Sequence, residues 1–150
     1  MTHLPAPLAP FSKHRAARTV CAAALLAPFG AFAAELQLNV ADGPAAASTL
    51  YVALFDSADA YSADKALASQ TAPMRDGAAQ IVFRGLAPGR YAVRMFADEN
   101  GNAKLDTNLV GMPTERYGFS NDAKGNRGAP GFDAAAIGVE ADVKTTVHLR

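Results

Sequence analysis

The sequence predicts an all-β fold: an antiparallel Greek-key β-sandwich of about seven strands, of immunoglobulin-like type. Three observations favour this class. Several short segments alternate apolar and polar residues, glycine and proline turns separate them, and no regular succession of strands and long helices follows. The prediction also includes one short helix and one long glycine-rich loop.

The first 33 residues have the three parts of a secretory leader. A basic stretch precedes an uncharged apolar run from 19 to 32, and the segment ends in Ala31-Phe32-Ala33. The run is too short to span a bilayer, and Cys21 lies near its start, not at its end where lipid attachment requires it. We therefore expect a removed leader, a single domain over residues 34–150, no membrane span, and a periplasmic or secreted product.

Loss of the leader changes the charge balance. It leaves 117 residues with 11 basic and 14 acidic side chains, a net charge of −3, and no cysteine. The basic residues are scattered singly, so no clustered basic face is expected for a nucleic-acid backbone. A chain of this length can bury enough apolar surface to fold without disulfides.

Six segments are predicted as strands, five of them because they alternate apolar and polar residues. The segment 50–55 is apolar on both faces, which is typical of a central strand. Residues Ser62 to Ser69 are predicted as the helix, because Ser62 can cap the first turn and the alanines that follow favour helix. The strand segments are residues 35–40, 50–55, 80–84, 90–95, 137–139 and 143–150.

Two further segments have distinctive composition. Pro88 and Gly89 form a turn signal directly before Tyr91, which predicts a tyrosine corner, with the ring buried and the hydroxyl bonded to main chain. The segment from Asp106 to Asp133 has five glycines, two prolines and no sustained period. Long loops in compact domains are often functional, so this one is the best place for a binding site.

One constellation has metal-binding spacing. Carboxylate and amide side chains alternate after the strand that ends near Ala97, and a Ca²⁺ ion takes six to eight such oxygens from a curled loop. Ala103 stands where a sharp turn normally has glycine, and Leu109 where a bidentate Glu is usual. A metal-free polar hairpin around Asn100-Gly101 is the alternative. The candidate ligands are Asp98, Asn100, Asn102, the carbonyl of Lys104, and Asp106.

Catalytic constellations of the common kinds are missing after the leader. His148 is the one histidine there, and it alternates with core residues near the chain end, which predicts a solvated strand position. Ser120 has no basic partner nearby in sequence, so neither a Ser-His-Asp site nor a zinc site is expected. Carboxylate-pair chemistry stays formally open, with Asp98, Glu99, Asp106 and Glu115 as candidates.

Several motifs resemble a known family. They read VALFDS, FRGLAPGRYAVRMFADENGNAKLDTN, GMPTERYGFSNDA and AP.F..AA, and together they extend over nearly all of residues 34–150. They are similar to the exported bacterial domain of unknown function 2141. The resemblance implies a transthyretin-like or carboxypeptidase-regulatory-like sandwich, and no catalytic roles can be carried over from it, because the family has no established activity. The family loop typically has glycine where this chain has Ala103, and its YGFSN segment corresponds to residues 117–121.

We therefore expect an exported, non-catalytic binding or structural module without a firm cofactor, Ca²⁺ being the one candidate. Its ligand would be a peptide or glycan, held by Glu115, Tyr117, Phe119 and Asn121 beside the acidic loop. The alternative for the aromatic pair is that both rings cap the core. Two other functions stay open: a small hydrolase resembling transthyretin-related enzymes, whose histidines this chain lacks, and assembly through an exposed strand edge.

Overall fold

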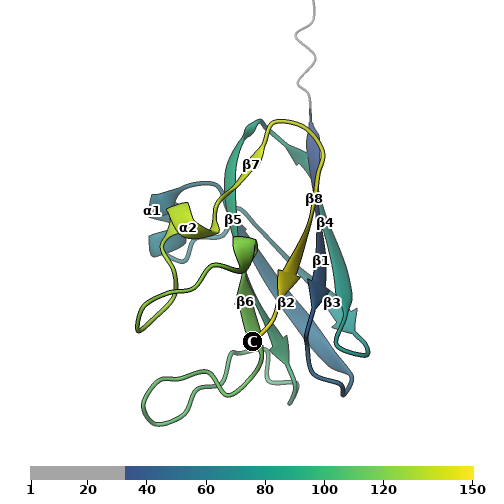
Figure 1. The fold of residues 1–150 in the computed structure, drawn as a ribbon, viewed down its shortest axis with the longest axis vertical. Coiled ribbons are helices and arrows are strands. Elements are labelled where there is room, and N and C mark those ends of the chain that lie inside the picture. The colour runs from purple at the N-terminus through teal and green to yellow at the C-terminus, as the bar shows by residue number, and fades with distance from the viewer. Residues whose placement is uncertain (1–32) are drawn as a thin grey trace, which may run out of the picture.

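A computed structural model describes residues 33–150, so the predicted leader lies outside the described residues. The described chain forms eight strands arranged in two sheets that face each other (Figure 1). This confirms the predicted all-β sandwich. None of the helices within residues 33–150 combines the length and the apolar character that crossing a bilayer would require.

The smaller sheet has the strand order β4-β1-β8. Its central strand β1 (Ala34–Ala41) pairs antiparallel with β4 (Ala79–Leu86) and parallel with β8 (Val143–His148). The parallel pair departs from the predicted all-antiparallel arrangement. Alternation along a strand reports which face is buried but not which direction its neighbour runs, so the sequence pattern could not predict this pair.

The larger sheet has the order β3-β2-β5-β6. β2 (Ser48–Phe55) and β5 (Gly89–Asp98) form its centre, and β3 (Ala68–Met74) is the edge strand beside β2. On the other side of β5, β7 (Ile137–Val139) pairs near its start and β6 (Tyr117–Phe119) near its end.

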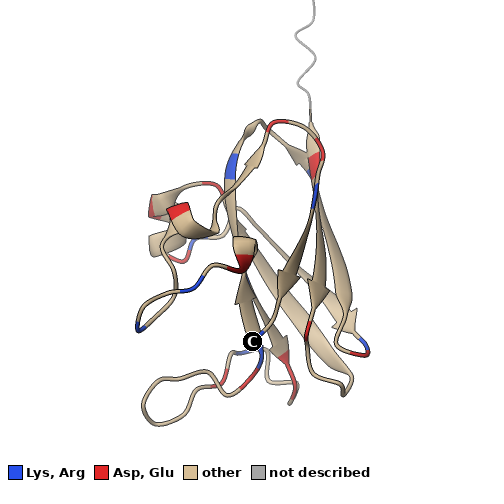
Figure 2. Cartoon of the chain, in the orientation of Figure 1, with Lys and Arg blue, Asp and Glu red and all other residues tan. Residues whose placement is uncertain are grey.

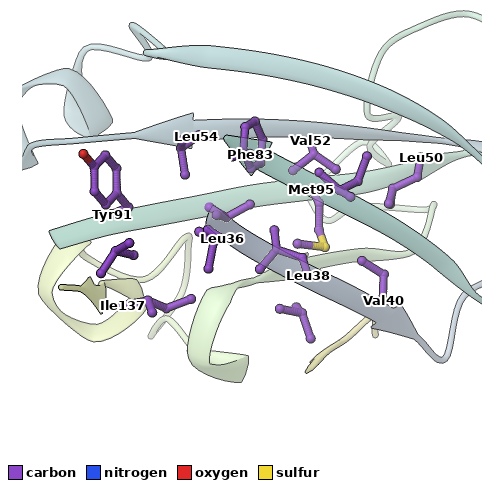
Figure 3. Packing of buried hydrophobic residues seen from close by; sticks show 14 of the residues in the cluster. Leu36, Leu38, Val40, Leu50, Val52, Leu54, Phe83, Tyr91, Met95 and Ile137 are labelled. Atoms are coloured by element: carbon purple, nitrogen blue, oxygen red, sulfur yellow. The ribbon is translucent and has the colours of Figure 1, made fainter. Parts of the chain in front are cut away.

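The main core lies between the two sheets. Val52, Ile81, Val93 and Val147, which the alternation predicts to be interior, are each at most 3% exposed. Figure 3 shows leucine and valine side chains of β1 and β2 pointing toward one another with Phe83 and Met95 between them. Each such side chain stabilises the fold by about 1.5–3 kcal/mol. Every residue of this core lies within 34–150.

The predicted helix is wrong in position. Helix α1 spans Ala58–Ser62, and its N-cap is Ser57, whose hydroxyl accepts the Ala60 N–H at 3.3 Å. Residues 68–74, partly assigned to the helix, instead form β3 and pair with β2 over seven positions. A short alanine-rich segment has a weak helix preference, which strand pairing with β2 overrides.

The long loop from 106 to 133 is partly regular, which the sequence did not predict. It contains β6, a 3₁₀ turn η1 (Ser120–Asp122) and the start of helix α2 (Phe132–Ala135). The helices α1 (Ala58–Ser62) and α2 and the turn η1 cover part of the outer face of the larger sheet, the face turned away from the main core (Figure 1). A second buried cluster lies beneath them, made of Phe55, Tyr61, Ala92, Phe119, Ala123 and Ala135.

The predicted tyrosine corner is confirmed. Tyr91 is 6% exposed, and its hydroxyl donates to the Ala87 carbonyl at 2.8 Å. The ring fills the end of the core while the hydroxyl fixes the Pro88-Gly89 turn that joins β4 in one sheet to β5 in the other.

Replacement of Tyr91 by Phe removes this hydrogen bond and keeps the ring. We expect the free energy of unfolding, measured with urea, to fall by about 1 kcal/mol. Tyr51→Phe is the matched control, because its ring lies on the half-buried outer face, and it should change stability by less than about 0.5 kcal/mol. Equal effects of the two substitutions would contradict a role for the corner.

Candidate functional site

The acidic turn, residues 98–106, begins where β5 ends. Asp98 is 3% exposed although it is charged. Its carboxylate accepts the backbone N–H groups of Gly101 at 2.7 Å, Asn102 at 3.2 Å and Ala103 at 2.8 Å. These bonds curl the chain tightly around one carboxylate, as in a cation-binding loop or a capped turn.

Glu115 closes the acidic turn from the returning chain. It is 7% exposed, and its two carboxylate oxygens accept the N–H of Glu99 and the N–H of Asp106, both at 3.0 Å. One side chain thereby joins the beginning and the end of the turn. The sequence placed Glu115 on a ligand surface, whereas its hydrogen bonds give it a role inside the turn.

The remaining predicted ligands gather on the open side of the turn. The side-chain amides of Asn100 and Asn102 both donate to the Asp106 carboxylate, and the Lys104 N–H donates to Asn102 Oδ1 at 2.8 Å. Within residues 33–150, no three His, Cys, Asp or Glu side chains are grouped to hold a metal. A cation here would therefore depend on amide and main-chain oxygens as well as on carboxylates.

Backbone conformation explains why glycine suits this turn. Gly101 has φ of 80° and Ala103 has φ of 60°, both in the left-handed region. A side chain at Ala103 is strained there, because its Cβ approaches the following carbonyl. An alanine at this position thus makes the turn harder to form than a glycine would.

Burial and hydrogen bonding act in opposite directions on Asp98. Burial of the carboxyl raises its pKa, but hydrogen bonds from the N–H groups of residues 100–103 outweigh that effect, so the pKa lies below its usual value of 3.8. The ionised form of Asp98 is therefore more favourable, relative to the protonated form, in the folded chain than in the unfolded chain.

This lowered pKa predicts a pH dependence. The carboxylate contributes its full stabilisation above pH 3.8 and loses it as the pH falls through the lower folded-state pKa. Urea unfolding across this range should show a stability advantage of the parent over Asp98→Asn that shrinks with acid. Asp76→Asn, in an exposed turn, is the control. A pH-independent difference between parent and Asp98→Asn would contradict the assignment.

A hollow of about 620 Å³ lies beside the acidic turn on the outer face of the larger sheet. Its floor follows from the register: Thr71, Tyr51 and Phe96 stand opposite one another on β3, β2 and β5. The rings of Tyr51 and Phe96 are stacked, with centroids 5.1 Å apart and planes 7° apart. Both rings are only half-buried. We call this space the outer hollow.

Arg94 forms one wall of the outer hollow. Its guanidinium lies 3.7 Å from the centre of the Tyr61 ring, donates to the Tyr61 carbonyl at 2.7 Å, and pairs with Asp64 at 3.0 Å. Leu105 from the acidic turn lines the hollow as well, together with Ser69 of the edge strand. The hollow therefore lies between the helix-covered half of the sheet and the acidic turn.

The four residues of the predicted ligand surface do not form one open face. Glu115 and Phe119 are buried, Tyr117 is half-buried, and Asn121 is exposed with its amide donating to the Ala136 carbonyl at 2.7 Å. The guanidinium of Arg150 lies over both aromatic rings, 5.3 Å from the centre of Tyr117 and 5.7 Å from that of Phe119. Phe119 also belongs to the second buried cluster, so it packs as part of the interior.

Two other residues considered from the sequence have structural partners. The hydroxyl of the buried Ser120 accepts the Val93 N–H at 2.8 Å and donates to the Ala135 carbonyl. His148 lies on the surface 2.8 Å from Asp42. That hydrogen bond, with the charge of Asp122, raises the pKa of His148 above its usual value.

Comparison with known proteins identifies the family. The family described as "Uncharacterized protein conserved in bacteria (DUF2141)" matches residues 39–147. The chain belongs to the DUF2141 family. The matched range includes β2 and β5, the acidic turn and Glu115, so the DUF2141 region contains both candidate features. No curated protein and no solved structure has significant similarity to this chain.

Proposed function

We propose that this DUF2141 protein is an exported, non-catalytic binding module that holds a peptide segment in the outer hollow. One observation carries the proposal: two large rings, Tyr51 and Phe96, are only half-buried on a sheet face whose other half is covered. A concave, mostly apolar space with a few polar groups at its border is typical of ligand sites, and about 620 Å³ lies within their usual size.

The lining of the hollow favours a peptide over a glycan. Tyr51, Phe96 and Leu105 offer apolar surface, while the guanidinium of Arg94 is already engaged by Asp64. A glycan brings many hydroxyl groups, and each one that loses water without a new partner weakens binding. An apolar peptide side chain has no such requirement, and the peptide's main chain could remain near Ser69 on the edge strand β3.

Selection from a random short-peptide library on the immobilised domain tests this proposal. Enriched peptides should carry a large apolar side chain and should bind Phe96→Ala at least about tenfold more weakly than the parent. Thr146→Ala, on the exposed side of β8 in the other sheet, is the matched control and should bind like the parent. Enrichment equal on parent and Phe96→Ala, or binding of maltohexaose in place of peptides, would overturn the assignment.

We further propose that the acidic turn binds Ca²⁺ and that the ion stiffens the wall containing Leu105. The supporting observation is the gathering of Asn100 and Asn102 around the Asp106 carboxylate. An amide that turns by half a rotation presents its oxygen where its nitrogen was. The same side chains can therefore exchange amide-to-carboxylate hydrogen bonds for oxygen ligands to a cation.

Calorimetric titration of the domain with Ca²⁺ measures this directly. The small number of carboxylates and the strain at Ala103 predict a dissociation constant of about 1 mM, in the range of extracellular modules. Ala103→Gly should tighten binding severalfold by relieving that strain, and Asp106→Asn should weaken it. Neither heat nor a rise in melting temperature at several millimolar Ca²⁺ would refute the site.

A further inference from the structure

Residues 107–113 form a loop that we call the apolar tip. Leu109 is 106% exposed, Val110 is 81% exposed and Met112 is 57% exposed, the three highest values among the large hydrophobic residues in the described chain. The loop projects from the end of the larger sheet, beyond the acidic turn (Figure 1). Single exposed apolar residues are ordinary, whereas three in one short loop indicate a surface that is covered in use.

Hydrogen bonds within the apolar tip pair several of its own backbone groups. The Asn108 N–H donates to the Met112 carbonyl at 2.8 Å, and the Gly111 N–H donates to the Asn108 carbonyl at 2.9 Å. The side chain of Asn108 accepts the N–H groups of Val110 at 3.1 Å and Met112 at 3.0 Å. These four N–H groups need no water, which lowers the cost of moving the loop into a medium that offers no hydrogen bonds.

The charged residues nearest the tip lie at its base. No residue from 107 to 113 is charged, and Figure 2 shows the protruding loop without charged residues and its base with both signs. The carboxylates of Asp106 and Glu115 accept hydrogen bonds within the acidic turn, and the side chain of Glu99 is exposed. The flanking Lys104 and Arg116 are exposed, and neither joins an ion pair within residues 33–150.

We propose that the apolar tip inserts into the interface of a lipid bilayer, with Lys104 and Arg116 at the level of the headgroup phosphates. Three aliphatic side chains offer far less than the roughly 800 Å² per partner of a stable protein dimer. A bilayer accepts a small convex apolar loop without a shaped pocket, and headgroup phosphates offer partners for the two cations. The proposal goes beyond peptide binding, because no residue of the tip lines the outer hollow.

Vesicle flotation tests the proposal. The chain starting at Ala34 is used, because it contains every described strand and both buried clusters, and because the apolar leader would itself bind lipid. The parent should float with vesicles of phosphatidylethanolamine and phosphatidylglycerol. Leu109→Ser with Val110→Ser should lower its partition coefficient by roughly tenfold or more.

Leu67→Ser is the matched control, because Leu67 is 52% exposed but lies outside the tip, and it should leave partition unchanged. Lys104→Gln with Arg116→Gln should reduce the partition coefficient severalfold, because the two side chains lose their pairing with headgroup phosphates. Melting temperatures of all variants should match the parent. Failure of the parent to float, or equal flotation of the double serine variant, would overturn the proposal. So would a parent that is dimeric in solution when the double serine variant is monomeric.

Discussion

The antiparallel pairing of β2 with β5 is the interaction on which the rest of the structure depends. It runs without interruption from Thr49 opposite Asp98 to Phe55 opposite Ala92. Inward side chains of both strands form the centre of the main core, and outward ones provide the second cluster and the aromatic floor of the outer hollow. The pairing also holds Asp98 at the sheet end, where its carboxylate starts the acidic turn.

A sheet that carries apolar residues on both faces needs cover on both. The smaller sheet covers the inner faces of β2 and β5, whereas α1, α2 and η1 cover only the outer half that includes Phe55 and Ala92. The uncovered half keeps Tyr51 and Phe96 partly in water. That unequal cover separates a packed half of the outer face from the half that contains the outer hollow.

Features that depend on residues close together in the sequence could be predicted. The arrangement of apolar residues predicted six strands, the Pro88-Gly89 signal predicted the tyrosine corner, and the spacing of oxygen side chains indicated the acidic turn. β3 was missed because its apolar residues are mostly small and Pro73 interrupts them, so only its partner β2 makes it a strand. The outer hollow and the two hydrogen bonds that Glu115 accepts in the acidic turn were missed for a related reason. Both join residues that are distant in sequence, and no periodicity indicates such contacts.

The unequal cover of one sheet face can be measured by proton NMR with a soluble paramagnetic probe. Tyr51, Phe96, Phe55 and Tyr61 all have rings on the outer side of the larger sheet. We expect strong relaxation of the Tyr51 and Phe96 ring protons and weak relaxation of those of Phe55 and Tyr61. Equal relaxation of all four rings, or protection of Tyr51 and Phe96, would contradict this unequal cover.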